Sequence, residues 1–213
     1  RFDDAGRNRE VDGGRARRPW LHTRAAASTI GYARQEGNQL KILLAISHGI
    51  DRINEKFALF ANWLVLLACM VSAGNAFSRY ALGLSSNAWL EIQWYLFGAL
   101  VLLGASYTLK RNEHVRVDIV YGRLSTRAQI WIDILGGIFF LLPATIIISW
   151  LAWPMCHNSY LEHEVSGNAG GLLRWPVKLL VPLGFWLLSL QGISEIIKRI
   201  AMLRGELPTD VHY

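Results

Sequence analysis

Residues 57–78 read FALFANWLVLLACMVSAGNAFS, a run of 22 positions without a charged side chain. As an α-helix, a run of this length extends about 33 Å, which is enough to cross the hydrocarbon core of a bilayer, roughly 30 Å thick. Three further apolar runs of similar length occupy residues 89–109, 128–153 and 176–197. The sequence therefore predicts an all-α integral membrane protein with four transmembrane helices in residues 57–197.

The charged residues are concentrated outside these runs. They make up only 18% of the 213 residues, compared with ~25% in soluble domains. The net charge of +6 would suit an ordinary basic soluble domain, but the separation of apolar runs from charged islands excludes that class.

The chain before the first span divides into two parts. Residues 1–39 contain eight arginines and no long apolar run, which predicts a disordered, basic cytoplasmic tail. Attraction to anionic lipid head groups is the functional alternative for this tail. Residues 198–213 form a second, short cytoplasmic tail.

Residues 40–57 have the pattern of an amphipathic helix. Apolar side chains recur there at alternating intervals of three and four, at Leu43, Ile46, Ile50, Ile53 and Phe57. We expect a separate interfacial helix before the first span. Its apolar stripe either lies in the membrane interface or covers a partner subunit.

Basic residues predict the orientation of the chain, because Lys and Arg are retained on the cytoplasmic side during insertion. Of the 22 Lys and Arg residues, 19 lie in residues 1–56, 110–127 and 198–204. Both termini are therefore expected in the cytoplasm. Tryptophans at the opposite ends of the spans suit the head-group layer there; they are Trp89, Trp94, Trp150, Trp153 and Trp175.

Four ionisable side chains inside or beside the spans are functional candidates, because a charge in lipid is costly. They are Arg79, Glu91, Asp133 and Glu195. Arg79 and Glu91 each lie six residues from Ser85 in the first connection, so a tight hairpin places both roughly 9 Å below its tip. We expect a structural charge pair, with contact to substrate or to a partner subunit as the alternative. Asp133 and Glu195 are expected to reach water or basic neighbours, without a role in ion coupling.

Several kinds of chemistry lack the residues they need. The spans contain no histidine that could be an axial haem ligand, and the two cysteines form no CxxC motif. A polar stretch after the third span has no common zinc spacing; it contains Cys156, His157, Glu162, His163 and Glu164. We therefore predict no catalytic residue, cofactor or metal site.

The span interiors are mostly aliphatic, and no cluster of polar residues marks a substrate site at mid-depth. Ala68, Ser72 and Ala76 form a stripe of small residues that would let another helix approach, either within the chain or from a partner. The bundle is therefore interpreted as a scaffold.

One stretch, AFSRYALGLSSNAWLEIQWYLFGALVLLGASYTLKRNEHVRVDIVYGRL at residues 76–124, resembles a known family. It is similar to the small permease subunit, DctQ-like, of tripartite ATP-independent periplasmic (TRAP) transporters. The residues that carry the resemblance are Arg79, Tyr80, Trp89 and Glu91, together with the cytoplasmic motif His114, Arg116 and Asp118.

The resemblance implies a subunit of the bacterial inner membrane that does not itself bind solute. In that family a soluble periplasmic binding protein delivers an organic acid to a large permease of about a dozen spans, and sodium symport drives import. The small subunit would brace the large permease and offer part of the docking surface, with Arg79 and Glu91 in structure or docking and Asp118 capping a short helix. Membrane lipid is a further expected partner, and nucleic acid is not.

Two other functions stay open at this point. A stand-alone small channel or exporter would require symmetric self-association. A membrane anchor of an electron-transfer enzyme would require paired histidines or cysteines in the spans, which the sequence lacks.

Overall fold

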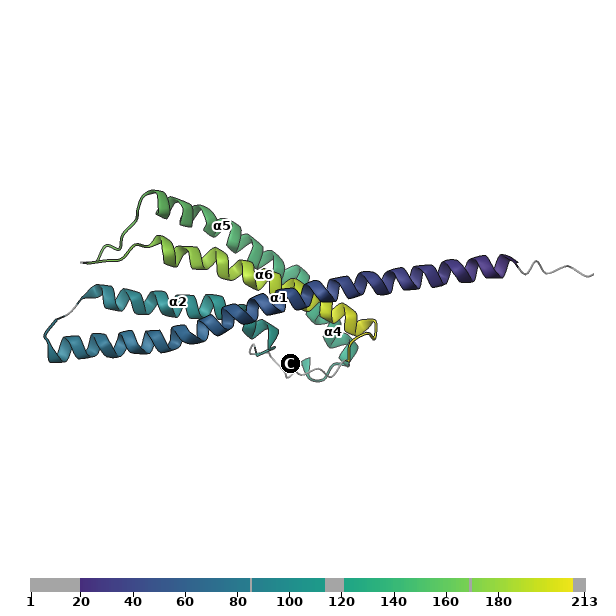
Figure 1. The fold of residues 1–213 in the computed structure, drawn as a ribbon, viewed down its shortest axis with the longest axis horizontal. Coiled ribbons are helices and arrows are strands. Elements are labelled where there is room, and N and C mark those ends of the chain that lie inside the picture. The colour runs from purple at the N-terminus through teal and green to yellow at the C-terminus, as the bar shows by residue number, and fades with distance from the viewer. Residues whose placement is uncertain (1–19, 85, 114–120, 169, 209–213) are drawn as a thin grey trace, which may run out of the picture. The chain divides into compact units, whose positions relative to one another are not determined.

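The fold is that of a computed structural model, which describes residues 20–84, 86–113, 121–168 and 170–208, with side chains from residue 38 onward. The described residues are helical apart from their turns (Figure 1). The elements are α1 (Trp20–Ala81), α2 (Asn87–Lys110), α4 (Thr126–Gly136), the π-helical turn η1 (Gly137–Leu141), α5 (Leu142–Leu161) and α6 (Trp175–Leu203).

Four helical segments are long and apolar enough to cross a membrane: Asn38–Ala81, Asn87–Lys110, Thr126–Leu161 and Trp175–Leu203. The predicted all-α fold with four membrane spans is thereby confirmed. Each helix extends beyond its apolar run, because the polar residues that flank a run are themselves compatible with a helix.

The expected separate amphipathic helix is not seen. Residues 40–57 belong to α1, which continues unbroken from Trp20 to Ala81. No proline or glycine lies between Asp51 and Phe57, so nothing breaks the helix before the span. The same helix also includes residues 20–39, which we had expected to be disordered, whereas residues 1–19 lie outside the described part.

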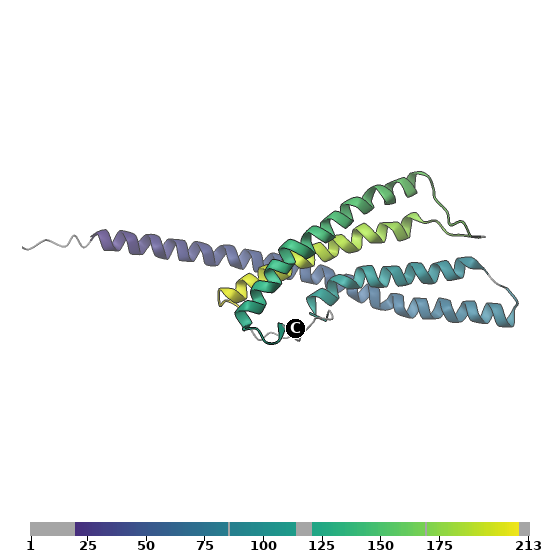
Figure 2. The same cartoon turned by 180° about the vertical axis from the view of Figure 1, so that it is seen from behind.

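The chain divides into two compact units, Arg1–Leu40 and Lys41–Tyr213. Everything that follows concerns the second unit. Within it α6 lies between α5 and α2 and packs against both, as Figure 1 and the reverse view in Figure 2 show.

Local sequence explains where the helices begin and turn. The hydroxyl of Ser86 accepts a hydrogen bond from the Ala88 N–H and caps α2. Gly83 follows α1 with φ +67°, a conformation that glycine adopts without strain. The π-helical turn η1 precedes Pro143, which has no N–H to donate, so the irregular turn accommodates the missing bond within one span.

Two small apolar clusters hold the second unit together. Ala61, Leu103 and Leu187 join α1, α2 and α6 near mid-length. A second cluster joins α4 to the end of α6 through Ile130, Ile134 and Met202. At Gly184 a Cβ would lie 2.8 Å from the backbone oxygen of Leu102, so α6 and α2 approach closely there.

Candidate functional site

Among the described residues of the second unit, one polar network lies at each end, and single hydroxyl contacts join α5 to α6 between them. We call the end where α2 finishes, α4 begins and α6 finishes the base. The other end, where α1 connects to α2 and α5 connects to α6, is called the loop end. The base network and the loop-end network are described in turn.

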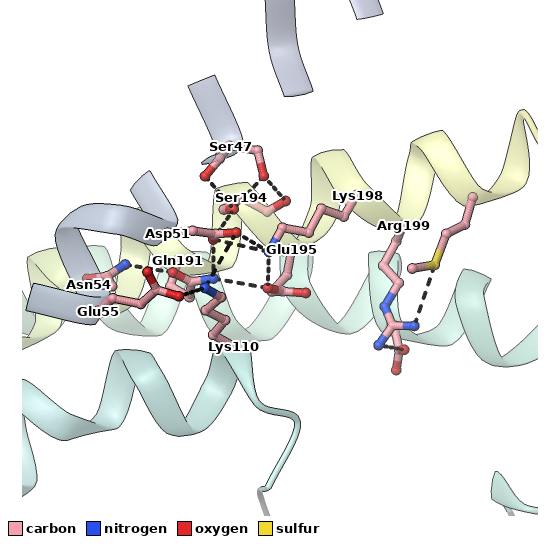
Figure 3. A network of polar contacts seen from close by, with 12 residues as sticks. Ser47, Asp51, Asn54, Glu55, Lys110, Gln191, Ser194, Glu195, Lys198 and Arg199 are labelled. Atoms are coloured by element: carbon pink, nitrogen blue, oxygen red, sulfur yellow. Dashed lines mark hydrogen bonds and ion pairs between the residues drawn. The ribbon is translucent and has the colours of Figure 1, made fainter. Parts of the chain in front are cut away.

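In the base network, one polar face of α1 lies against one polar face of α6 (Figure 3). Ser47, Asp51 and Asn54 are spaced by four and three residues and are all buried. The facing residues of α6 follow similar helical spacing and are buried too; they are Gln191, Ser194 and Lys198. Such spacing places each set on one side of its helix.

The Asp51 carboxylate is the centre of this network. It accepts hydrogen bonds from Gln191 Nε2 at 3.0 Å and from Ser194 Oγ at 2.9 Å. Lys198 Nζ lies 2.8 Å from Asp51 Oδ2 and also 2.8 Å from Glu195 Oε1. The buried charge is therefore matched by an ammonium group and by neutral donors from another helix.

The remaining contacts extend the network to other residues and helices. Asn54 Nδ2 donates to Gln191 Oε1 at 2.7 Å, and the Ser47 and Ser194 hydroxyls are 2.7 Å apart. Lys110, the last residue of α2, pairs with Glu55 at 2.6 Å. Three helices therefore meet at the base through side chains that would be costly to separate in a membrane.

Asp133 and Glu195 have protein partners at the base. Arg199 lies 3.2 Å from Asp133, whose carboxylate also accepts a hydrogen bond from the Tyr121 hydroxyl at 3.0 Å. Glu195 pairs with Lys198. The basic neighbours that we expected for both carboxylates are thus residues of α6. The Arg199–Asp133 pair connects α6 to α4, whereas the Glu195–Lys198 pair lies within α6.

The base network uses the polar face of residues 40–57, for which no contact was predicted. The polar face of α1 is buried against α6, and the apolar stripe faces outward, with Ile46 51% and Ile53 49% exposed. Sequence reasoning missed Asp51 because it considered contacts only for the apolar stripe of this helix. The sequence did indicate this contact, because polar residues recur at helical intervals both from Ser47 to Asn54 and from Gln191 to Lys198.

In the loop-end network, Glu91 of the first turns of α2 holds the loop of residues 162–174, the α5–α6 loop. Its buried carboxylate accepts hydrogen bonds from the Ser166 hydroxyl, from Asn168 Nδ2 at 2.8 Å and from the Leu172 N–H at 2.8 Å. One side chain of α2 thus fixes three points of a loop that lies some 75 residues or more further along the chain.

Backbone hydrogen bonds within the α5–α6 loop also fix its conformation. The Ser166 N–H donates to Leu172 O at 2.9 Å, and the Arg174 N–H donates to Glu164 O at 2.9 Å, forming a short antiparallel turn. At Gly171 a Cβ would lie 2.5 Å from Ser166 Cβ and 2.7 Å from Ser166 O. Only glycine fits this position without displacing the backbone.

Glu164 anchors the same loop to α6. Its carboxylate pairs with Lys178 and lies 3.4 Å from Arg174 Nη1. The bond from Lys178 is the main reason why the pKa of Glu164 falls to about 2 from its ordinary value of 4.5. Both carboxylates at the loop end therefore serve to fix the α5–α6 loop.

The predicted site residues have mixed outcomes. No ion pair joins Arg79 to Glu91 in the described residues, because Glu91 is occupied by the α5–α6 loop. Arg79, Tyr80 and Trp89 are exposed, Tyr80 at 86%. The cytoplasmic motif of His114, Arg116 and Asp118 lies outside the described residues. In the part that is described, no three His, Cys, Asp or Glu side chains are grouped as metal ligands.

Comparison with known proteins gives one match. The family model described as tripartite ATP-independent periplasmic transporters, DctQ component, matches residues 68–202. This range includes Glu91, the α5–α6 loop and the α6 side of the base network, but it begins after Asp51. Neither the curated proteins nor the solved structures give a significant match.

Proposed function

Because the chain belongs to the DctQ family, the small membrane component of tripartite ATP-independent periplasmic transporters, we propose that it is the scaffold subunit beside the large permease. The members of this family are transporter components, and the family is not an enzyme family. Its membership implies association with a large permease and with a periplasmic binding protein. The match gives no support to a stand-alone channel or an electron-transfer anchor.

The observation that carries the scaffold role is the position of the polar contacts. They connect helices at the base and fix a loop at the other end. Between these ends, apolar side chains of α1, α2 and α6 meet, and hydroxyl groups join α5 to α6. A subunit that must stay still beside a moving partner needs fixed helix positions. Ion pairs between α1, α2 and α6 supply them at the base.

The α5–α6 loop supports a role in docking the binding protein. The loop is held in one conformation by Glu91 and Glu164, and exposed residues of the same end include Tyr80 and Trp89. A surface that is ordered before binding loses less conformational entropy when a partner docks. The distribution of Lys and Arg favours the periplasm for this end and the cytoplasm for both termini.

The transport that this subunit serves is proposed from its family. It is the import of an organic acid across the bacterial inner membrane, coupled to sodium. The large permease and the binding protein would carry the solute and sodium sites, and this chain would contribute neither.

Purification tests the scaffold role. The full chain is tagged in its host and extracted in mild detergent, and the polypeptides that co-purify are identified. We expect the large permease in equal amount, and vesicles containing both subunits should take up an organic acid only when the binding protein and a sodium gradient are present. Uptake by vesicles that contain this chain alone would contradict the proposal.

Docking is tested separately with the assembled complex in lipid nanodiscs. Glu91→Gln removes the charge that holds the α5–α6 loop, and we expect about a tenfold weaker affinity for the binding protein, since the loop must then be ordered on docking. The matched control is Glu206→Gln, the same change at an exposed position after α6 at the base, which leaves Glu91 and its loop contacts in place. Equal affinities for wild type and Glu91→Gln would remove the loop from the docking surface.

A further inference from the structure

A groove between α1 and α2 is open on one side of the described bundle. Near the loop end it holds a cavity of about 420 Å³. Its lining includes Ala68, Cys69 and Ser72 of α1 and Gln93, Trp94 and Phe97 of α2. Nearer the base, a second cavity of about 200 Å³ lies between Asn62 of α1 and Tyr107 of α2.

The α1 wall of this groove has the spacing of a helix-packing seam. Ala58, Asn62, Val65, Cys69 and Ser72 follow one another at intervals of four and three. This heptad spacing is the pattern by which one helix receives another in a left-handed crossing. Three of these residues, Ala58, Cys69 and Ser72, are also small, which allows close approach in a membrane.

Polar groups in the groove indicate what kind of molecule it accommodates. Asn62 is exposed and Gln93 half-buried within the spans, and neither amide has a hydrogen-bond partner among the described residues. An unsatisfied amide facing hydrocarbon costs free energy, and acyl chains offer it no donor or acceptor. A protein helix with polar side chains can satisfy both amides.

The charge at the base end of the groove adds a second requirement for the molecule that binds there. Glu55 lines the cavity near the base and keeps 49% of its side chain exposed beside Lys110. Membrane helices carry Lys and Arg at their cytoplasmic ends. A helix whose cytoplasmic end meets Glu55 would therefore be complementary in charge, and its polar side chains would lie at the depth of Asn62 and Gln93.

From this complementarity we infer that the α1–α2 groove receives one transmembrane helix of the large permease. The inference rests on the proposed function, because it needs that partner, and it adds the face through which the two subunits meet. The partner helix has small or polar side chains toward Asn62 and Gln93 and a basic residue near Glu55. The groove is thus a site of subunit assembly.

Site-specific photo-crosslinking tests the inference in the full complex. Trp94, which lines the groove and is 76% exposed, is replaced by the photoreactive amino acid p-benzoylphenylalanine. The matched control places the same amino acid at Trp153 of α5, which is 57% exposed and lies eight residues from the loop end of its helix. An adduct with the large permease is expected from position 94 and not from position 153.

A second pair of variants tests whether a large side chain on the α1 wall of the groove blocks the partner helix. Ser72→Trp fills the groove, whereas Leu67→Trp introduces the same side chain five residues away, at an exposed position that lines neither cavity. Ser72→Trp should lower recovery of the large permease at least about tenfold, because overpacking displaces the incoming helix. Leu67→Trp should leave recovery unchanged.

The outcomes separate the two proposals. If the permease co-purifies with wild type but position 94 gives no permease adduct, or an adduct with lipid or with a second copy of this chain, the groove assignment is wrong and the scaffold role stands. Equal recovery for the two tryptophan variants has the same meaning. If wild type retains no large permease, the proposed function fails and the groove assignment fails with it.

Discussion

The base network and the loop-end network both bury a carboxylate, but they stabilise different things. At the base, Asp51 faces an ammonium group, and its partners lie on another membrane helix. At the loop end, Glu91 is surrounded by a hydroxyl, an amide and a backbone N–H of one loop. The base network therefore fixes the position of helices, whereas the loop-end network fixes the conformation of a connection.

The difference has an energetic consequence. Removing one partner of a buried ion pair leaves an uncompensated charge, which typically costs about 3–5 kcal/mol. Removing a carboxylate that neutral donors surround leaves donors near water at an exposed end, which costs less. Substitutions in the base network should therefore lower the stability of the whole bundle. Substitutions in the loop-end network should affect only the α5–α6 loop.

The largest effect is expected from Asp51→Ala, which removes the α1 carboxylate that faces the buried Lys198 ammonium group. We expect a loss of about 3–5 kcal/mol in the free energy of unfolding, measured by chemical denaturation in detergent. His48→Ala, at an exposed position on the same helix, is the control and should change stability by less than about 0.5 kcal/mol. A similar loss in both variants would mean that the base network does not determine helix position.

A double substitution sharpens this prediction. Asp51→Ala combined with Lys198→Met removes both charges and nearly keeps the volume of the lysine side chain. A buried pair replaced by apolar residues is often neutral or stabilising, so the double variant should recover at least half of the stability lost by Asp51→Ala. If it is as unstable as the single variant, the hydrogen bonds of Gln191 and Ser194 and not the ion pair fix α1 on α6.

The next effect in size is expected from Gly171→Ala. Its Cβ would lie 2.5 Å from Ser166 Cβ, so the α5–α6 loop must move. We expect faster proteolytic cleavage of the loop and a cost of about 1–3 kcal/mol that is confined to it. Gly167→Ala is the matched control, since its Cβ meets nothing within 4 Å. Equal cleavage rates for the two variants would show that the loop is not held as the structure shows.

The same comparison explains what could be predicted from sequence. The four spans follow from the length of apolar runs, because a bilayer accepts few alternatives to a helix of that length. Glu91 was identified as a candidate because of its depth in the membrane. Its partners were not, because depth does not determine which way a side chain points, and residues 166–172 are far from it in sequence.

The base network was harder to anticipate for a different reason. In water, an amphipathic helix buries its apolar stripe and leaves its polar face in solvent, and no protein contact was predicted for the polar face of residues 40–57. In a membrane protein the apolar stripe can face lipid while polar residues join helices. Ser47, Asp51 and Asn54 follow the second rule, which could have been inferred only by pairing them with Gln191, Ser194 and Lys198.

The smallest effect is expected from mild acid at the loop end. The pKa of Glu164 is about 2 in the folded protein and 4.5 for the free side chain, mainly because Lys178 pairs with it. A lowered pKa means that the stabilisation by this group is complete above about pH 4.5 and is lost only as the pH falls through about 2.

Protease protection of the α5–α6 loop should therefore change little between pH 7 and pH 4.5, measured with a protease that is active over that range. Glu164→Gln removes the ionised group, so the variant should be cleaved faster than wild type at every pH in this interval, by a constant factor. A wild-type cleavage rate that rises to the level of the variant already near pH 4.5 would show that Lys178 does not hold Glu164 in its ionised form. In that case the loop would depend on Glu91 alone, and the loop-end network would reduce to a single carboxylate.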